Sequence, residues 1–359
     1  MQKQTLKPID KQLLDIYSDY LISSFSHTTA TGLSRMLDNQ ITHDKVTQFL
    51  SSREYTSRDL WLLIKPTLRN IETDDGCIIF DDTIQEKQWT DENDIMCWHY
   101  DHAKQRYLKG VNILNCIYHN DNGTLPLAFE IIKKTKLVTN PKTGKTNRQS
   151  EITKNELFVQ MFEKTLKNQV KFKYVLADSW FSSADNMTMV VNRKKHFVFA
   201  IKVNRLVALS KSDKLRGNFQ PVSSLKLEKD EVMKCYFKGV DFPTLLTKQI
   251  FKDKDNSERV LYLATSDRQL DSASLNAIYH KRWKVEEYHK SIKHNTGLAK
   301  SPTKTVTTQS NHFFASIYAF HKLELLNMKM SLNHFALKSK LYVKALMLSF
   351  KELQALQSA

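Results

Sequence analysis

Hydrophobic positions repeat at helical spacing through the first 70 residues of the chain. Val46, Phe49 and Leu50 share one face of a segment that Thr42 can cap. A short helix predicted over 32–37 precedes this segment, so the pair has the outline of a helix-turn-helix. Any helical bundle contains such pairs. The pattern therefore leaves two interpretations open for residues 1–72, a DNA-binding module and a plain helical bundle.

From about residue 75 the spacing changes to that of strands. Compact apolar runs at 77–80, 174–177 and 197–201 predict buried strands. Asn120-Asp121-Asn122-Gly123 predicts a tight turn between two further strands, near 112–118 and 125–131. Helices are predicted near 154–166 and 184–195. Strands first, and then alternating helices and strands, predict a mixed α/β (α+β) fold in which helices pack on a mixed sheet.

The second half of the chain contains three more patterns. Residues 205–268 are strand-like and rich in turns, whereas 270–298 and 309–330 have the spacing of long helices. The aromatic run over 313–320 is typical of a helix core or a dimer surface. Residues 140–147 contain Gly144-Lys145-Thr146, the end of a phosphate-binding loop, but Thr139 stands where that motif needs Gly. We interpret this stretch as a basic surface loop.

Charge and composition narrow the choice of partners. Among 359 residues, 54 Lys and Arg exceed 38 Asp and Glu, and the formal net charge of +16 favours a polyanion such as nucleic acid. The basic residues concentrate in 133–173, with 11 basic and 3 acidic residues, and in 270–359, with 13 and 5. No apolar run approaches the roughly 20 residues of a membrane span, so no membrane partner is predicted.

The four cysteines contain no CxxC pair, which argues against a structural zinc site. We predict that they are buried core residues of a reduced, cytoplasmic protein. They are Cys77, Cys97, Cys116 and Cys235.

Two acids follow apolar strands, Asp82 after 77–80 and Asp178 after 174–177. Sites in open sheets form at the carboxyl ends of strands. An Asp in that position is also common as a turn or cap residue, so neither acid is decisive alone. Asp81 is the rival of Asp82, because alternation along a strand places only one of the two on a given face.

A third signal lies in the helical segment 270–298. Tyr279, Arg282, Glu286 and Lys293 have offsets of 0, 3, 7 and 14, and at about 100° per residue they fall on a stripe about 60° wide. Such a stripe can simply face water. Combined with the two strand-end acids, it predicts an oxygen-rich site for Mg²⁺ or Mn²⁺. Two such ions about 3.5–4 Å apart would activate a water or a DNA 3′-hydroxyl.

These residues resemble the motifs of a known family. Tyr279-x2-Arg282-x3-Glu286-x6-Lys293 matches the YREK signature of bacterial insertion-sequence DDE transposases of the insertion-sequence-four (IS-four) group. Phe80-Asp81-Asp82-Thr83 is similar to the first acidic motif of that family, and Leu176-Ala177-Asp178-Ser179-Trp180-Phe181 to the second. The resemblance covers roughly residues 20–330.

The resemblance implies an RNase H-like core with a DDE triad. Asp82, Asp178 and Glu286 would be the catalytic metal ligands, with Asp82 preferred to Asp81 because the family motif places the catalytic Asp immediately before Thr. Arg282 and Lys293 would bind DNA phosphates, and Tyr279 would pack against or hydrogen-bond to the same DNA backbone.

The resemblance also implies a domain order and an activity. The expected segments are a helical, candidate DNA-binding domain (1–72), the first part of the catalytic core (73–204), a β-rich insertion (205–268), the helix that completes the core (269–300) and a C-terminal helical region (301–359). The expected activity is cut-and-paste transposition by a homodimer that is cytoplasmic and associated with the nucleoid. Its partners would be double-stranded DNA, both terminal inverted repeats and target DNA.

Three points stay open at this level. A non-catalytic DNA-binding regulator and an RNase H-like nuclease without strand transfer are the alternative functions. Some relatives stack a flipped base on a Trp in the insertion, whereas residues 205–268 contain no Trp. Another aromatic residue of this segment could take that place, so the use of a DNA hairpin intermediate stays open. The candidates are Phe219, Tyr236, Phe237 and Phe242.

Overall fold

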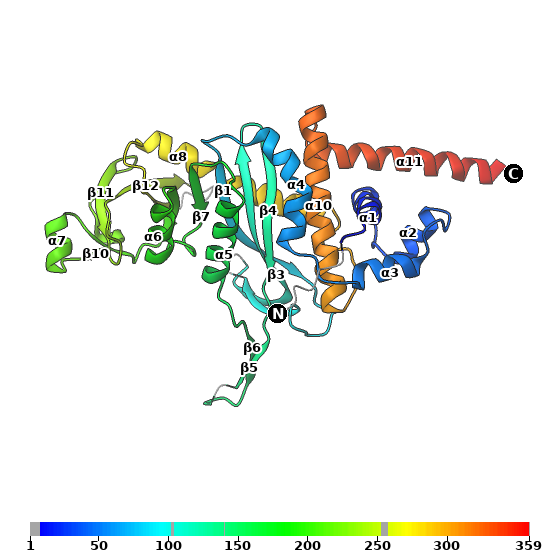
Figure 1. Ribbon diagram of the computed structural model, residues 1–359, viewed down its shortest axis with the longest axis horizontal. Helices are drawn as coiled ribbons and strands as arrows, with labels where there is room; N and C mark the ends of the chain where they lie inside the picture. Colours follow the sequence, from blue (N-terminus) through cyan, green and yellow to red (C-terminus); the bar gives the residue numbers. More distant parts are fainter. Residues whose placement is uncertain (1–7, 102–103, 140, 253–257, 359) are drawn as a thin grey trace.

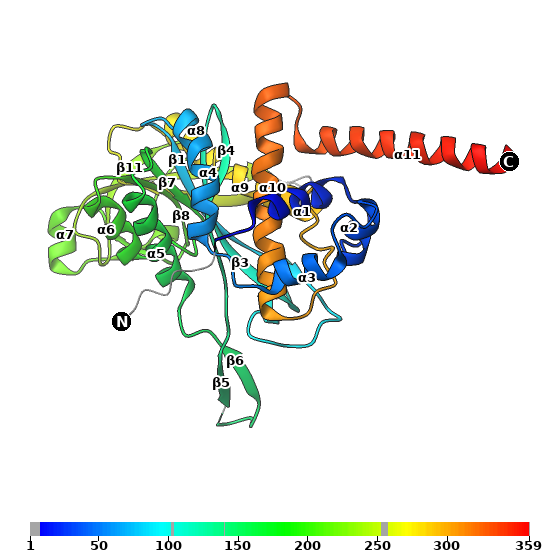
Figure 2. The ribbon, with the colours of Figure 1, turned by 45° about the vertical axis from the view of Figure 1, so that its right-hand side comes forward.

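A wide mixed sheet runs through the centre of the molecule, with helices on its faces and one long helix projecting from an end (Figures 1 and 2). The computed structural model describes residues 8–101, 104–139, 141–252 and 258–358. Within them, one sheet contains 11 strands and a separate small sheet contains two.

Five strands form the core of the large sheet. β1 (Cys77–Glu86) pairs antiparallel with β3 (Arg106–Asn120), which pairs antiparallel with β4 (Gly123–Ile131). On its other side, β1 pairs parallel with β7 (Tyr174–Ala177), and β7 pairs parallel with β8 (His196–Ile201). Three antiparallel strands followed by two parallel ones are an RNase H-like order. The predicted fold class is confirmed.

The parallel strands are reached through two helices, α5 (Lys154–Lys167) and α6 (Ala184–Asn192). The apolar face of α5 packs on β1, where the rings of Phe158 and Phe80 have centroids 4.3 Å apart. Phe158 also stacks on Phe181, with centroids 5.4 Å apart. All three side chains are fully buried. This aromatic contact fixes α5 on one face of the sheet and leaves the other face of β1 to the C-terminal half of the chain.

The β-rich insertion extends the same sheet. Its last strand pairs antiparallel with β8, so the hydrogen-bonded ladder continues from the core into the insertion. The strands and helices of this region are β9 (Leu206–Ala208), α7 (Lys211–Arg216), β10 (Gln220–Pro221), η1 (Val222–Ser224), β11 (Val232–Phe237), β12 (Thr244–Lys252) and β13 (Glu258–Thr265).

The N-terminal helices pack around α10 (Val306–Met330), which is buried along most of its length. Thr42 accepts a hydrogen bond of 3.3 Å from the Lys45 amide and caps its helix, as predicted. Leu13 at the N-terminus and Phe313 on α10 belong to the same hydrophobic cluster as Phe80. The predicted domain boundary at 72 therefore divides a continuous core. The helices are α1 (Lys11–Ser23), α2 (Ala30–Met36), α3 (His43–Ser51) and α4 (Ser57–Ile71).

The long helix predicted over 270–298 is two helices, α8 (Ser272–His280) and α9 (Trp283–His294). Lys281 and Arg282 keep right-handed helical dihedrals. Their hydrogen bonds tighten, because the Arg282 amide donates to the Tyr279 carbonyl at 2.9 Å, an i to i−3 bond. Of the four residues of the signature, Tyr279 lies on α8, Arg282 at the break, and Glu286 and Lys293 on α9.

The strands β2 (Cys97–Asp101), β5 (Lys136–Thr139) and β6 (Thr146–Gln149) were not predicted from the sequence. The last helix, α11 (His334–Ser358), lies in the C-terminal region that was expected to be helical. The predicted basic loop over 140–147 includes Asn140, which lies outside the described residues, and its remainder lies at the end of the β5–β6 hairpin. α11 is the helix that projects from the body (Figure 1).

All four cysteines are buried with free thiols, in agreement with the sequence-based prediction. Among the described residues, no helix combines the length and the apolar character required to cross a bilayer.

Candidate active site

The first two acids lie side by side, just beyond the point where the parallel pairing of β1 with β7 ends. Phe80 on β1 is paired in register with Ala177 on β7. One residue further along each strand, Asp81 and Asp178 occupy neighbouring positions, and alternation turns both toward the same face. The Asp178 carboxylate accepts a hydrogen bond of 2.9 Å from the Trp180 amide, which holds it in the turn after β7.

Helix α9 covers this face of β1. Arg282, at its start, donates a hydrogen bond of 3.0 Å to the Asp81 carboxylate. Lys293, near its end, donates one of 2.6 Å to the hydroxyl of Thr83, the next residue on the Asp81 face. The two contacts lie along the length of the helix and fix its register against β1.

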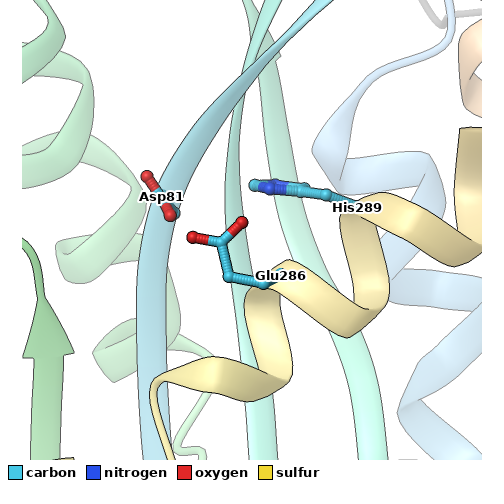
Figure 3. A group of neighbouring side chains, drawn as sticks. All are labelled: Asp81, Glu286 and His289. Carbon is cyan, nitrogen blue, oxygen red and sulfur yellow. The ribbon is translucent and has the colours of Figure 1, made fainter. Parts of the chain in front are cut away.

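Glu286 projects from the first turn of α9 toward Asp81 (Figure 3). Its carboxylate lies 3.5 Å from the Arg282 guanidinium, which therefore contacts both acids. Oxygen atoms of Asp81 and Glu286 and a ring nitrogen of His289 all lie within 4.8 Å of one another. Strand β1 and helix α9, far apart in the sequence, thus place a carboxylate pair and an imidazole at one point.

Asp82, the sequence-based choice for the first metal ligand, faces the other way. Its carboxylate accepts a hydrogen bond of 2.7 Å from Lys154 at the start of α5, on the face that also holds Phe80. The structure thus brings Asp81, rather than Asp82, beside Glu286, because α9 packs on the Asp81 face. The assignment of Asp82 as a metal ligand stays a prediction, and the geometry favours Asp81.

Three of the four residues of the Tyr-Arg-Glu-Lys pattern line a cleft, and the fourth packs behind one of them. Arg282, Glu286 and Lys293 line a cleft of about 700 Å³ together with Asp81, Asp82 and Asp178. Tyr279 lies beneath the cleft, where the Arg282 guanidinium is 5.8 Å from its ring centroid. Burial raises the pKa of Tyr279 to about 12, so the phenol stays protonated. Tyr279 is half-buried and packs against Arg282.

Burial shapes the electrostatics of the cleft. It raises the pKa of Asp81 to about 8; Arg282 opposes this rise, and Asp178 and Glu286 add to it. Burial likewise raises the pKa of Asp178. Three acids with one intervening guanidinium leave an excess of negative charge, which a cation would offset. Oxygen donors of this kind suit Mg²⁺ or Mn²⁺, so the residues present fit a divalent metal.

His289 was not identified from the sequence, although it follows Glu286 by three positions and so shares its helix face. Burial lowers its pKa to about 3, with Lys293 and Arg282 adding to the effect, so the ring is neutral. Asn115 on β3, paired in register with Asp81, has its amide nitrogen 3.2 Å from His289 Nε2.

The orientation of Asn115 is fixed by its other contacts. Its amide nitrogen donates to the Ile113 carbonyl at 3.1 Å, and its oxygen accepts from the Tyr288 hydroxyl at 3.1 Å. His289 Nε2 is therefore the acceptor of the Asn115 hydrogen bond, and Nδ1 carries the ring proton. In this tautomer the imidazole has no free lone pair, so the groups of this cluster that could hold a metal ion are the carboxylates of Asp81 and Glu286.

Comparison with known protein families adds an independent observation. Residues 7–215 match the family described as DDE superfamily endonuclease, and this span contains Asp81, Asp82 and Asp178 and ends before Glu286. No curated protein matches the chain. DDE-type nucleases act on DNA and use divalent metals, which agrees with the neighbouring carboxylates of Asp81 and Glu286. The match extends over more than half of the chain, and the chain belongs to the family of DDE superfamily endonucleases.

Proposed function

We propose that the protein is a DDE transposase that moves an insertion sequence by cutting and rejoining DNA. It hydrolyses the DNA at the terminal inverted repeats and then joins the freed 3′-hydroxyl to target DNA. The observation that carries this proposal is the single cleft in which Asp81, Asp178 and Glu286 lie with Arg282 and Lys293. Acids that bind metal and bases that bind phosphate are the groups that phosphodiester chemistry requires.

Asp81, Asp178 and Glu286 are the residues that would hold two Mg²⁺ or Mn²⁺ ions. When bound, the ions supply a nucleophile at neutral pH and stabilise charge on the leaving oxygen. The protein contributes the placement of the acids. Arg282 contacts two of the three carboxylates, and His289 and Asn115 pack behind them from α9 and β3.

Positively charged side chains at the rim of the cleft would bind the DNA backbone. Lys293 and Lys154 line it from opposite faces of β1, bonded to Thr83 and Asp82. Burial lowers the pKa of Lys293, and a phosphate beside it would favour the charged form. Each ammonium can exchange its protein partner for a phosphate oxygen, which orients the scissile bond over the acids.

Transposition joins two element ends in one complex, so we expect a homodimer on double-stranded DNA. The N-terminal helices would supply part of the contacts to the terminal repeats. Non-specific phosphate affinity would come from the basic stretches and would weaken steeply with salt. The protein would act in the cytoplasm at the nucleoid, where its DNA lies.

A cleavage assay tests this proposal. Purified protein is mixed with Mg²⁺ and a duplex that carries the repeat flanking its own gene, and wild type is compared with Glu286→Ala. The proposal expects metal-dependent nicks that leave 3′-hydroxyls, joined products with a target plasmid, and loss of both in the variant. Nicking without joined products would indicate a nuclease without strand transfer. Binding without nicks, in Mg²⁺ and Mn²⁺ alike, would indicate a DNA-binding regulator.

A further inference from the structure

A second cleft lies beside the catalytic one, between the β5–β6 hairpin and the edge formed by β2 and β3. Its volume is about 750 Å³. The hairpin projects from the body below the sheet (Figures 1 and 2). The lining residues that matter here are Trp98, Tyr107, Lys134, Leu137, Lys145 and Arg148.

One wall of this cleft exposes aromatic rings to solvent. Alternation along β2 buries Cys97 and His99 and exposes Trp98 and Tyr100, which are 52% and 41% exposed. Tyr100 is paired in register with Tyr107 on β3, which is 68% exposed, and the two rings have centroids 5.2 Å apart. Three large rings on one face of a ribbon leave apolar surface in water, which indicates a ligand that covers it.

The opposite wall is basic. The sequence from 133 to 149 contains six Lys and Arg and no Asp or Glu. β5 is exposed along its whole length, and Lys145 is exposed just before β6. Glu92 also lines the cleft, so its positive charge is partly offset. The aromatic wall can stack on the base of a nucleotide, and the basic wall can bind its phosphate.

The hairpin is held in place at its base. Arg148 donates a hydrogen bond of 3.0 Å to Asp94 and one of 3.3 Å to the Lys134 carbonyl. Lys134 in turn donates one of 2.6 Å to the Trp98 carbonyl. These bonds link β6 and β2 with the segment that precedes β5, so the aromatic wall and the basic wall are held together at the base of the hairpin.

The two clefts are neighbours, because Lys134 lines both of them. Tyr100 lines the catalytic cleft and contacts Tyr107 in the second cleft. A DNA strand that leaves the catalytic acids along this wall meets Tyr100, then Tyr107 and Trp98, with the hairpin on its other side.

We propose that this second cleft binds an unpaired DNA strand next to the cut, with bases stacked on Trp98 and Tyr107 and phosphates beside Lys145. Duplex DNA does not fit this chemistry, since the faces of paired bases are covered by their neighbours. Aromatic platforms in a basic groove are typical of sites for single strands. The inference rests on the proposed function in one respect, that DNA enters the catalytic cleft.

Fluorescence anisotropy with the full-length protein tests this site. The probes are a labelled 15-nucleotide oligo-dT and a blunt duplex of the same length, in EDTA so that no cleavage occurs. Trp98→Ala and Tyr107→Ala are compared with wild type, with Tyr107→Phe, which keeps the ring, and with Phe251→Ala. Phe251 is a matched control, because it is an aromatic residue on a strand, 48% exposed, in the β-rich insertion.

We expect each alanine variant to bind oligo-dT roughly 5- to 100-fold more weakly than wild type, the loss of one stacked base. Tyr107→Phe and Phe251→Ala should bind within about twofold of wild type, and duplex binding should change little in all variants. Lys145→Ala should reduce the slope of log affinity against log salt by roughly 0.7.

Two results would overturn the site. One is oligo-dT binding by Trp98→Ala and Tyr107→Ala at the wild-type level. The other is an equal loss of duplex and oligo-dT binding in these variants. This measurement does not depend on catalysis. If the protein fails to cut DNA but the alanine variants lose oligo-dT binding selectively, the inference stands. If the protein cuts DNA and the alanine variants bind oligo-dT as wild type does, the inference is refuted.

Discussion

Arg282 donates a hydrogen bond of 3.0 Å to Asp81 across 201 positions of sequence. The same guanidinium is 3.5 Å from Glu286 on the next turn of the helix. One side chain thus contacts an acid from the first strand of the core and an acid from the helix that completes it. Arg282 lowers the repulsion between these carboxylates and fixes their relative orientation.

Substitution at the adjacent acids should separate their roles. We expect Asp81→Asn to slow cleavage by roughly a hundredfold or more, because a metal ligand contributes several kcal/mol to the transition state. Asp82→Asn should have a smaller effect, since it removes an ion pair with Lys154. Single-turnover cleavage of a terminal-repeat duplex measures both rates. The reverse order of effects would restore Asp82 as the metal ligand.

Divalent cations should stabilise the folded protein through the same acids. At a concentration one hundred times the dissociation constant, Mg²⁺ or Mn²⁺ adds about 2.7 kcal/mol to the free energy of unfolding. We expect thermal unfolding of wild type to shift upward and that of Glu286→Gln to shift much less. Glu287→Gln is the matched control, because Glu287 pairs with Lys284 at 2.8 Å. Equal shifts in all three proteins would place the bound ion elsewhere.

Acid should destabilise the fold through buried histidines away from the active site. Burial lowers the pKa of His119 and His321 to about 4 and that of His312 to about 3. In the unfolded chain each histidine has a pKa of about 6.5, so below that pH the unfolded state binds more protons than the folded state. The free energy of unfolding is therefore highest above pH 6.5 and falls as the pH is lowered toward 4. At pH 5 each of these histidines should lower the free energy of unfolding by about 1–2 kcal/mol. Urea unfolding at pH 7, 6 and 5 measures this loss, and an unchanged free energy of unfolding would contradict it.

Packing between α5 and the sheet should dominate the stability of the core. Phe158 is fully buried between Phe80 and Phe181, and Phe158→Ala removes its ring contacts with these two residues and with Phe199. We expect a loss of about 3–5 kcal/mol in the free energy of unfolding. Leu62→Ala, at a position 63% exposed on α4, should change it by less than about 0.5 kcal/mol. Chemical denaturation compares the two, and similar losses would refute this assignment of the core.

The parts of the fold that are buried on both sides could be predicted from the sequence. All four residues of Tyr174–Ala177 are buried, and their apolar run marks β7 directly. Asn120 and Gly123 bound the β3–β4 turn at the predicted position. Such segments carry their own signal, because burial of a central strand requires consecutive apolar residues.

The choice between Asp81 and Asp82 required the tertiary structure. Alternation shows that the two carboxylates face opposite ways, but the face that meets α9 depends on how a distant helix packs. The break between α8 and α9 could not be predicted from the sequence for a different reason. Lys281 and Arg282 keep helical dihedrals, and neither is a Gly or Pro that would mark the end of a helix in the sequence.

Exposed strands gave no hydrophobic pattern to detect. Both faces of the β5–β6 hairpin are in contact with solvent, so its residues need no alternation of polar and apolar side chains. In β2 the alternation is present but lasts for only five residues. The aromatic and basic walls of the second cleft therefore became evident only from the arrangement of these strands in space.

The pairing of β8 with β13 bears on how this protein can diversify. The chain leaves the core along β8 and returns beside it along β13, so the exit and the re-entry of the insertion are neighbours in the sheet. Residues between them can be lost or gained at the distant edge, near β10, without a change in the path that leads to α8. The number of residues between Asp178 and Glu286 in the sequence can therefore change during evolution, whereas the distance between them in space stays the same.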